Sequence, residues 1–89
     1  MDKIIYLGTT IKCSACKCQE HLLKRVVEDR PDIELRVCNY DELPDWLQSN
    51  VLLTDFPVTI ITEDDSIRYY FVGTKSVSKM RSLFEDIKF

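Results

Sequence analysis

Cys13 and Cys16 are separated by two residues and stand where a short apolar run gives way to a helical pattern. The apolar run, residues 3–7, is closed by a glycine and two threonines and predicts a buried strand. From Cys13 to about residue 30, apolar residues recur at helical spacing with charged residues opposite, which predicts an amphipathic helix. The pair therefore lies at a strand-to-helix junction, where a C-x-x-C spacing indicates redox chemistry.

The spacing of the two cysteines has a chemical reason. Residues three apart in a first helical turn lie on one side, so the sulfurs can close a disulfide with little backbone movement. Cys13 meets the unpaired N–H groups and the positive end of the helix, which favour a thiolate and lower its pKa, and Lys12 and Lys17 add positive potential. Cys16 falls on the buried side with Leu23, whereas Cys13 points away from it. We therefore predict that Cys13 is the nucleophile and Cys16 the resolving thiol.

The middle of the chain continues with a second strand and a second helix. Between residues 33 and 38 apolar and polar residues alternate, which is the period of a half-buried strand. Strand, helix and strand over roughly 30 residues match a right-handed parallel crossover unit. Asp41 is placed to cap a short second helix that fades by residues 49–50.

The last third of the chain predicts a strand pair and a final helix. Residues 58–62 and 67–72 are β-branched and aromatic runs joined by a polar turn of hairpin length, so we expect them to pair antiparallel. After Gly73, either Thr74 or Ser76 is placed to cap the final helix. The apolar residues of that helix share one face: Val77, Met80, Leu83, Phe84 and Ile87. The full order is strand, helix, strand, helix, strand, strand, helix, which is an α/β arrangement.

The length and the net charge of the chain limit the classes of function that it can have. The chain has 89 residues, enough for one hydrophobic core, so we expect a single domain over residues 1–89 and a monomer. A net charge of -3 gives no broad positive field, so we expect no binding to nucleic acid or to a membrane surface. The N-terminal apolar run is too short for a secretory signal or a membrane span, and we therefore expect a cytoplasmic location.

The cysteines are clustered rather than spread. Three of the four, Cys13, Cys16 and Cys18, fall within six positions, whereas a stapling disulfide framework spaces its cysteines along the chain. Clustering indicates redox chemistry or metal binding. Cys18 is rotated about 200° round the helix from Cys16, so we expect a partly buried bystander thiol, and Cys38 fits a packing position in a strand.

Pro57 opens the third strand. Proline cannot donate to a strand ladder, so the first position of a strand suits it. A cis bond between Phe56 and Pro57 would turn the Phe56 backbone outward. Its free N–H and C=O groups could then hold a bound thiol peptide as an added strand.

Together these features resemble the thioredoxin and glutaredoxin superfamily over almost the whole chain. The matches are the cysteine motif followed by two leucines, the Phe56–Pro57 step, and residues 71–73 before the last helix. The resemblance implies a thioredoxin-like fold with a central four-stranded mixed sheet and three helices. It also implies a cis Pro57 that faces the cysteine pair. Lys12, Phe56, Pro57, Gly73 and Thr74 then become the predicted substrate-binding residues around a groove for a peptide or for glutathione.

Departures from the two families refine this resemblance. Glutaredoxins usually have Cys-Pro-Tyr-Cys and a paired glycine, whereas this chain has Ser14 and Ala15 between the cysteines and a single Gly73. Lys12 precedes the pair where thioredoxins carry tryptophan, and Leu7 stands where they carry a buried acid. The chain resembles a small glutaredoxin-like redoxin more than a typical thioredoxin. That resemblance implies a dithiol-disulfide oxidoreductase acting on protein or glutathione mixed disulfides, without a metal or organic cofactor. The implied partners are a disulfide-containing protein such as a reductase, and glutathione or a thioredoxin-reductase-type donor, with glutathione as a co-substrate.

Two metal-binding alternatives remain open at this point. Residues 11–16 before an amphipathic helix also resemble the metal loop of heavy-metal chaperones, in which two thiolates could hold copper. A zinc or iron-sulfur site could instead use all four cysteines, including Cys38, although their spacing lacks the usual second C-x-x-C. Chaperones of that kind end in a strand, whereas this chain predicts a terminal helix.

Overall fold

The structure, a computed structural model, describes residues 2–89 and leaves Met1, the first residue of the predicted domain, outside the described part. The four strands are β1 (Lys3–Thr9), β2 (Ile33–Asn39), β3 (Val58–Glu63) and β4 (Ser66–Val72). The helices are α1 (Ser14–Glu28), the 3-10 turn η1 (Tyr40–Glu42), α2 (Asp45–Gln48) and α3 (Val77–Asp86). No helix within residues 2–89 has the length and apolar character needed to cross a bilayer.

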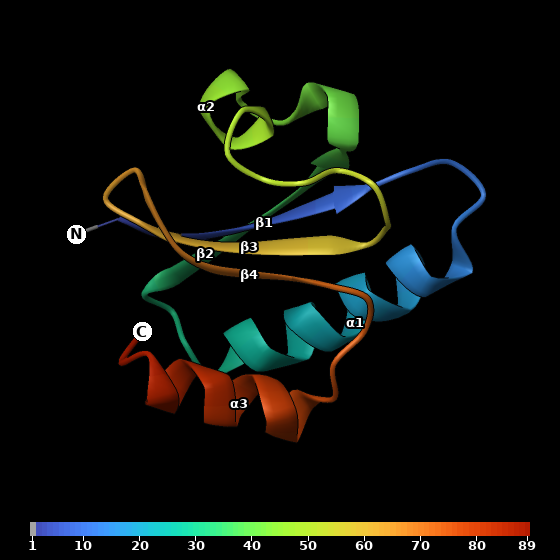
Figure 1. Ribbon diagram of the computed structural model, residues 1–89. Helices are drawn as coiled ribbons and strands as arrows, with labels where there is room; N and C mark the ends of the chain where they lie inside the picture. Colours follow the sequence, from blue (N-terminus) through green and yellow to red (C-terminus); the bar gives the residue numbers. More distant parts are fainter. Residues whose placement is uncertain (1) are drawn as a thin grey trace.

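The strands form one mixed sheet in the order β2-β1-β3-β4. β1 and β2 pair in parallel and are connected by the crossover helix α1. β3 runs antiparallel to both β1 and β4. α1 and α3 cover one face of the sheet, and α2 lies on the other (Figure 1). The predicted α/β fold, with a four-stranded mixed sheet, is confirmed.

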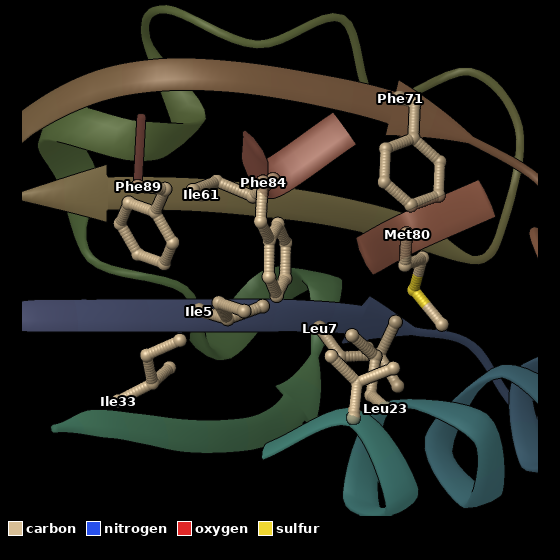
Figure 2. Packing of buried hydrophobic residues seen from close by; sticks show 10 residues of the cluster. Ile5, Leu7, Leu23, Ile33, Ile61, Phe71, Met80, Phe84 and Phe89 are labelled. Carbon is tan, nitrogen blue, oxygen red and sulfur yellow. The ribbon is translucent and has the colours of Figure 1, made fainter. Parts of the chain in front are cut away.

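The main hydrophobic core lies between the sheet and the helix pair α1 and α3. Figure 2 shows side chains from all these elements pointing into this layer. Ile5 and Leu7 enter from β1, Leu23 from α1 and Met80 from α3, and all four side chains are 0% exposed. Full burial of such a side chain stabilises the fold by about 1.5–3 kcal/mol, so this layer fixes α1 against the sheet.

A smaller cluster covers the opposite face. Tyr6, Val58 and Ile60 project from β1 and β3 toward Leu43 and Leu47 of the η1–α2 segment. Successive residues of a strand point to opposite faces, so the central strands are covered on both sides: β3 is buried at every position except its last, and β1 is buried from Ile5 to Gly8.

The predicted start of the second helix is wrong. Instead of one helix capped by Asp41, the chain forms η1, breaks at Leu43, and starts α2 after Pro44, without a side-chain cap on either piece. A residue before proline disfavours the helical region, and Leu43 has ψ 146°. Proline at the start of a helix is compatible with its missing N–H, so α2 begins there.

Strand ends also differ from the expectation. β1 continues through Gly8 to Thr9, where the sequence predicted an end at residue 7. In β2 the alternation fades, because β2 is an edge strand: Ile33 is buried, Leu35 half-buried and Val37 38% exposed. Of the two predicted caps of α3, it is Ser76 whose side chain accepts a hydrogen bond, from the backbone N–H of Lys79.

Candidate functional site

Cys13 and Cys16 form a disulfide at the start of α1, and their Cα atoms are 5.2 Å apart. Cys13 is the N-cap of the helix, with extended backbone, and its Sγ accepts a hydrogen bond from the backbone N–H of Cys16 at 3.1 Å. An N-cap side chain normally satisfies one of the free N–H groups of the first turn, and here a sulfur does so. The predicted proximity of the two sulfurs at a helix start is confirmed.

The two cysteines differ in exposure. Cys16 is 3% exposed, whereas Cys13 is half-buried. Cys16 is the more shielded of the two, as expected, whereas Cys13 is half-buried rather than exposed. The roles of the two residues in exchange stay predictions.

Lys12 and Lys17 flank the pair and both side chains are exposed. Lys12 takes a left-handed backbone conformation, with φ 53°, just before the N-cap. This turn carries the chain from the end of β1 into α1. Lys12 directly precedes Cys13 and Lys17 directly follows Cys16, so their ammonium groups add positive charge near the disulfide.

The bond between Phe56 and Pro57 is cis, as the resemblance implied. Within residues 2–89 neither the N–H nor the C=O of Phe56 makes a backbone hydrogen bond. The Phe56 ring is half-buried and packs against the ring of Tyr40, with 5.1 Å between centroids. The predicted pair of free backbone groups before Pro57 is therefore present.

Gly73 lies next to Pro57, because its N–H donates to the Pro57 carbonyl at 2.8 Å. Its φ of 88° is a conformation that favours glycine. Thr74 follows and is exposed. Gly73 and Pro57 are thus brought together as predicted, on adjoining segments, while no contact of Thr74 defines a role for it.

A shallow cleft of about 260 Å³ lies beside this region. It is lined by Thr10, Ile11, Asn39, Tyr40 and Asp41, so it joins the loop before the cysteines to the start of η1. Ile11 is 76% exposed and Tyr40 41% exposed. No local pattern in the sequence predicts this cleft.

Gln19 is a site residue that sequence analysis missed. It is 0% exposed, and its side chain bonds to Thr59 of β3 and to the backbone N–H of Lys75 after Gly73. A signal existed in the sequence: Gln19 lies between Cys16 and Leu23 on the apolar side of the helix, where a polar residue is out of pattern.

The other two cysteines are free thiols. Cys18 is exposed, so its expected partial burial is wrong, because the position faces solvent beyond the buried side of α1. Cys38 is half-buried, and burial together with the charge of Glu42 raises the pKa of its thiol. Among residues 2–89 no group of three or more Cys, His, Asp or Glu side chains is arranged to hold a metal.

No protein-family model matches the sequence. No curated protein matches it at a significant level.

Solved structures do resemble the fold. Desulfothioredoxin from Desulfovibrio vulgaris Hildenborough, in its reduced form, superposes with a TM-score of 0.83 over 97% of this chain and 82% of that chain, at 15% identity. Oxidized mitochondrial thioredoxin 3 from Saccharomyces cerevisiae gives a TM-score of 0.75 over 96% and 78%, at 21% identity. Thioredoxin O2 from Arabidopsis thaliana, also oxidized, gives 0.72 over 94% and 73%, at 15% identity. The chain therefore has a thioredoxin fold, whereas its closer similarity to glutaredoxins stays a prediction.

Proposed function

We propose that this protein is a thiol-disulfide oxidoreductase that reduces disulfides of protein substrates through Cys13 and Cys16. The observation that carries the proposal is the Cys13–Cys16 disulfide closed across the first turn of α1, with the Cys13 sulfur bonded to the Cys16 N–H. A thioredoxin fold alone does not imply an activity, since folds host many functions. The sulfur pair at the helix start supplies the chemistry.

The exchange takes place in two steps. In the reduced protein the Cys13 thiolate attacks one sulfur of the target disulfide, a mixed disulfide forms, and the other target sulfur leaves as a thiolate that takes up a proton. The Cys16 thiol, after losing its proton, attacks Cys13 and releases the second target sulfur. Two electrons pass to the target, and the protein ends in the disulfide form that the structure shows.

The surroundings of the pair favour a peptide as substrate. The free N–H and C=O of Phe56 can pair with an extended peptide backbone, as in other strand-addition complexes. Exposed Ile11 and Tyr40 offer apolar contacts to its side chains. A protein disulfide therefore suits this surface better than the disulfide of a small thiol.

The remaining partners follow from the same chemistry. The electron donor is glutathione or a flavoprotein of the thioredoxin-reductase type, and the target is a protein such as a reductase that forms a disulfide in its cycle. The protein acts as a monomer. It works in a reducing compartment such as the cytoplasm, because glutathione and thioredoxin systems keep thiols reduced there. Nucleic acid and membranes have no part in this scheme.

The test compares cysteine variants in reduction of a disulfide-linked peptide, driven in parallel by glutathione with its reductase and by a thioredoxin reductase. Cys13→Ser is expected to abolish turnover with either donor. Cys18→Ser removes an exposed thiol from the same helix and is the matched control, with activity unchanged. Full activity of Cys13→Ser would overturn the proposal.

A trapping experiment identifies the attacking sulfur. In Cys16→Ser the second step is removed, so incubation with the peptide disulfide should leave one peptide covalently bound to Cys13. Mass spectrometry of the digested adduct locates it. A peptide found on Cys18 or Cys38 instead would contradict the assignment of the nucleophile.

A further inference from the structure

Gln19 is a fully buried amide on the helix that carries the cysteines. Its side chain is 0% exposed, and it follows the 3% exposed Cys16 by three residues on α1. Residues three apart on a helix lie on the same side, so both side chains face the sheet. Burial of an amide is unfavourable unless its donors and acceptor are paired. The partners of Gln19 therefore indicate what the residue does.

Gln19 bonds to three different segments. Its Nε2 donates to Oγ1 of Thr59 at 3.2 Å and to Sδ of Met80 at 3.5 Å. Its Oε1 accepts from the backbone N–H of Lys75 at 3.1 Å. Thr59 belongs to β3, Lys75 to the loop between β4 and α3, and Met80 to α3. A single side chain thus joins α1 to all of them.

The bonded segments are those that carry the predicted substrate-binding residues. Thr59 lies two residues after Pro57, and Lys75 lies two residues after Gly73. The N–H of Gly73 donates to the carbonyl of Pro57 at 2.8 Å. The Pro57 segment and the Gly73 loop are therefore hydrogen-bonded to each other, and each is also hydrogen-bonded to Gln19.

We infer that Gln19 is a positioning residue that holds the Pro57 segment and the Gly73–Lys75 loop against the cysteine helix, so that a peptide disulfide binds in register with Cys13. The inference rests on the proposed function. None of the hydrogen bonds of Gln19 reaches the sulfur of Cys13 or of Cys16, so its effect falls on binding of the peptide rather than on exchange between sulfurs.

Two substrates separate binding from chemistry. The first is the disulfide-linked peptide, which uses the Phe56 and Pro57 backbone. The second is hydroxyethyl disulfide, which is too small to span these segments. In Gln19→Leu the Lys75 N–H and the Thr59 hydroxyl lose a buried partner. We expect KM for the peptide to rise about tenfold with kcat nearly unchanged, and turnover of the small disulfide to stay within about twofold.

A matched pair at Thr59 provides the second variant. Thr59→Val keeps the shape of the side chain and removes the hydroxyl, so KM for the peptide should rise about threefold. Thr59→Ser keeps the hydroxyl and should restore the original KM. His21→Leu, on the exposed side of α1, should change neither substrate.

The outcomes distinguish this inference from the proposed function. Absence of activity toward both disulfides in the unmodified protein would refute the proposed function itself. An active protein in which Gln19→Leu and Thr59→Val leave the peptide KM unchanged would refute the positioning role. Equal losses on both substrates would also refute it. If Gln19→Leu does not fold, the Thr59 pair decides by the same criteria.

Discussion

The Sγ atom of Cys13 accepts a hydrogen bond from the backbone N–H of Cys16 at 3.1 Å, so the first cysteine caps the helix that carries the second. In the oxidised protein this bond satisfies one free N–H of the first turn. In the reduced protein we expect the same N–H and the helix dipole to face the Cys13 sulfur and to stabilise negative charge there. One local arrangement therefore serves the structure of the disulfide form and the reactivity of the dithiol form.

This arrangement predicts the pH dependence of alkylation. The helix N-terminus favours the Cys13 thiolate in the reduced protein, so we expect the reaction of Cys13 with iodoacetamide to reach half-maximal rate at a lower pH than that of glutathione. The measurement is the alkylation rate of Cys13 against pH, read by mass spectrometry. Cys16→Ala is the matched variant, because it keeps the N–H donor and prevents disulfide formation. A midpoint equal to that of glutathione would contradict the prediction.

The two free thiols should differ in labelling of the oxidised protein. Cys18 is exposed, whereas Cys38 is half-buried and the pKa of its thiol is raised by burial and by Glu42. At neutral pH we expect iodoacetamide to label Cys18 about tenfold faster, and labelling of Cys38 to increase as pH rises toward its raised pKa. Peptide mapping after timed quenching gives both rates.

Two variants check this explanation. Cys18→Ser should remove the fast labelling by iodoacetamide and leave the slow labelling of Cys38. Glu42→Gln removes the negative charge beside Cys38, so the pKa of Cys38 should fall and its labelling should accelerate. Faster labelling of Cys38 than of Cys18 in the unmodified protein would show that the burial in the structure is wrong.

Most of the fold is predictable from the sequence because its signals are local. The apolar run of β1, the helical spacing after Cys13 and the β-branched runs of β3 and β4 each lie within a few residues. The cysteine pair and Pro57 are likewise visible as short motifs. Their mutual placement then follows from the resemblance to a known fold.

Other features depend on residues far apart in the chain and are not predictable in this way. Gln19 finds its partners 40 and 56 residues away, at Thr59 and Lys75. The exposed cleft likewise joins Ile11 to Tyr40 across the crossover. The break before α2 is different, because it is predictable from a local signal. Leu43 precedes a proline and therefore disfavours the helical region, but the helical spacing of the apolar residues around it favours one continuous helix.

Acid should weaken an ion pair at the end of the sheet away from the cysteines. Arg30 donates to both carboxylate oxygens of Asp32, at 3.0 and 2.9 Å, and Lys3 lies 3.4 Å away. The Arg30 guanidinium holds the pKa of Asp32 well below its ordinary value of 3.8. The folded state therefore binds fewer protons than the unfolded state as pH falls below this ordinary value, and the contribution of Asp32 is lost in that range.

The variant Asp32→Asn isolates this contribution. Asp32 is exposed, so the effect is small and is screened by salt. We expect Asp32→Asn to lower the free energy of unfolding at neutral pH and to approach the unmodified protein as pH falls well below 3.8. Urea denaturation at several pH values measures both. A difference that stays constant down to strong acid would contradict the assignment.

Gly8 allows close packing between the sheet and the segment before α2. A Cβ atom at this position would lie 2.8 Å from Cγ1 of Val58 and 3.1 Å from Cδ1 of Leu43. The valine side chain is stiff because it is β-branched, so it cannot easily turn away. We expect Gly8→Ala to lower the free energy of unfolding by about 1–3 kcal/mol, as overpacking does in other cores.

A double-mutant cycle tests the cause. Val58→Ala removes the clashing Cγ1 and leaves space of its own, so it destabilises the protein by itself. Combined with Gly8→Ala, the added methyl occupies that space, and the double variant should be more stable than the sum of the two single effects by about 1 kcal/mol. Denaturant unfolding of the four proteins gives the coupling. If the two losses simply add, the contact with Val58 does not explain why position 8 requires glycine.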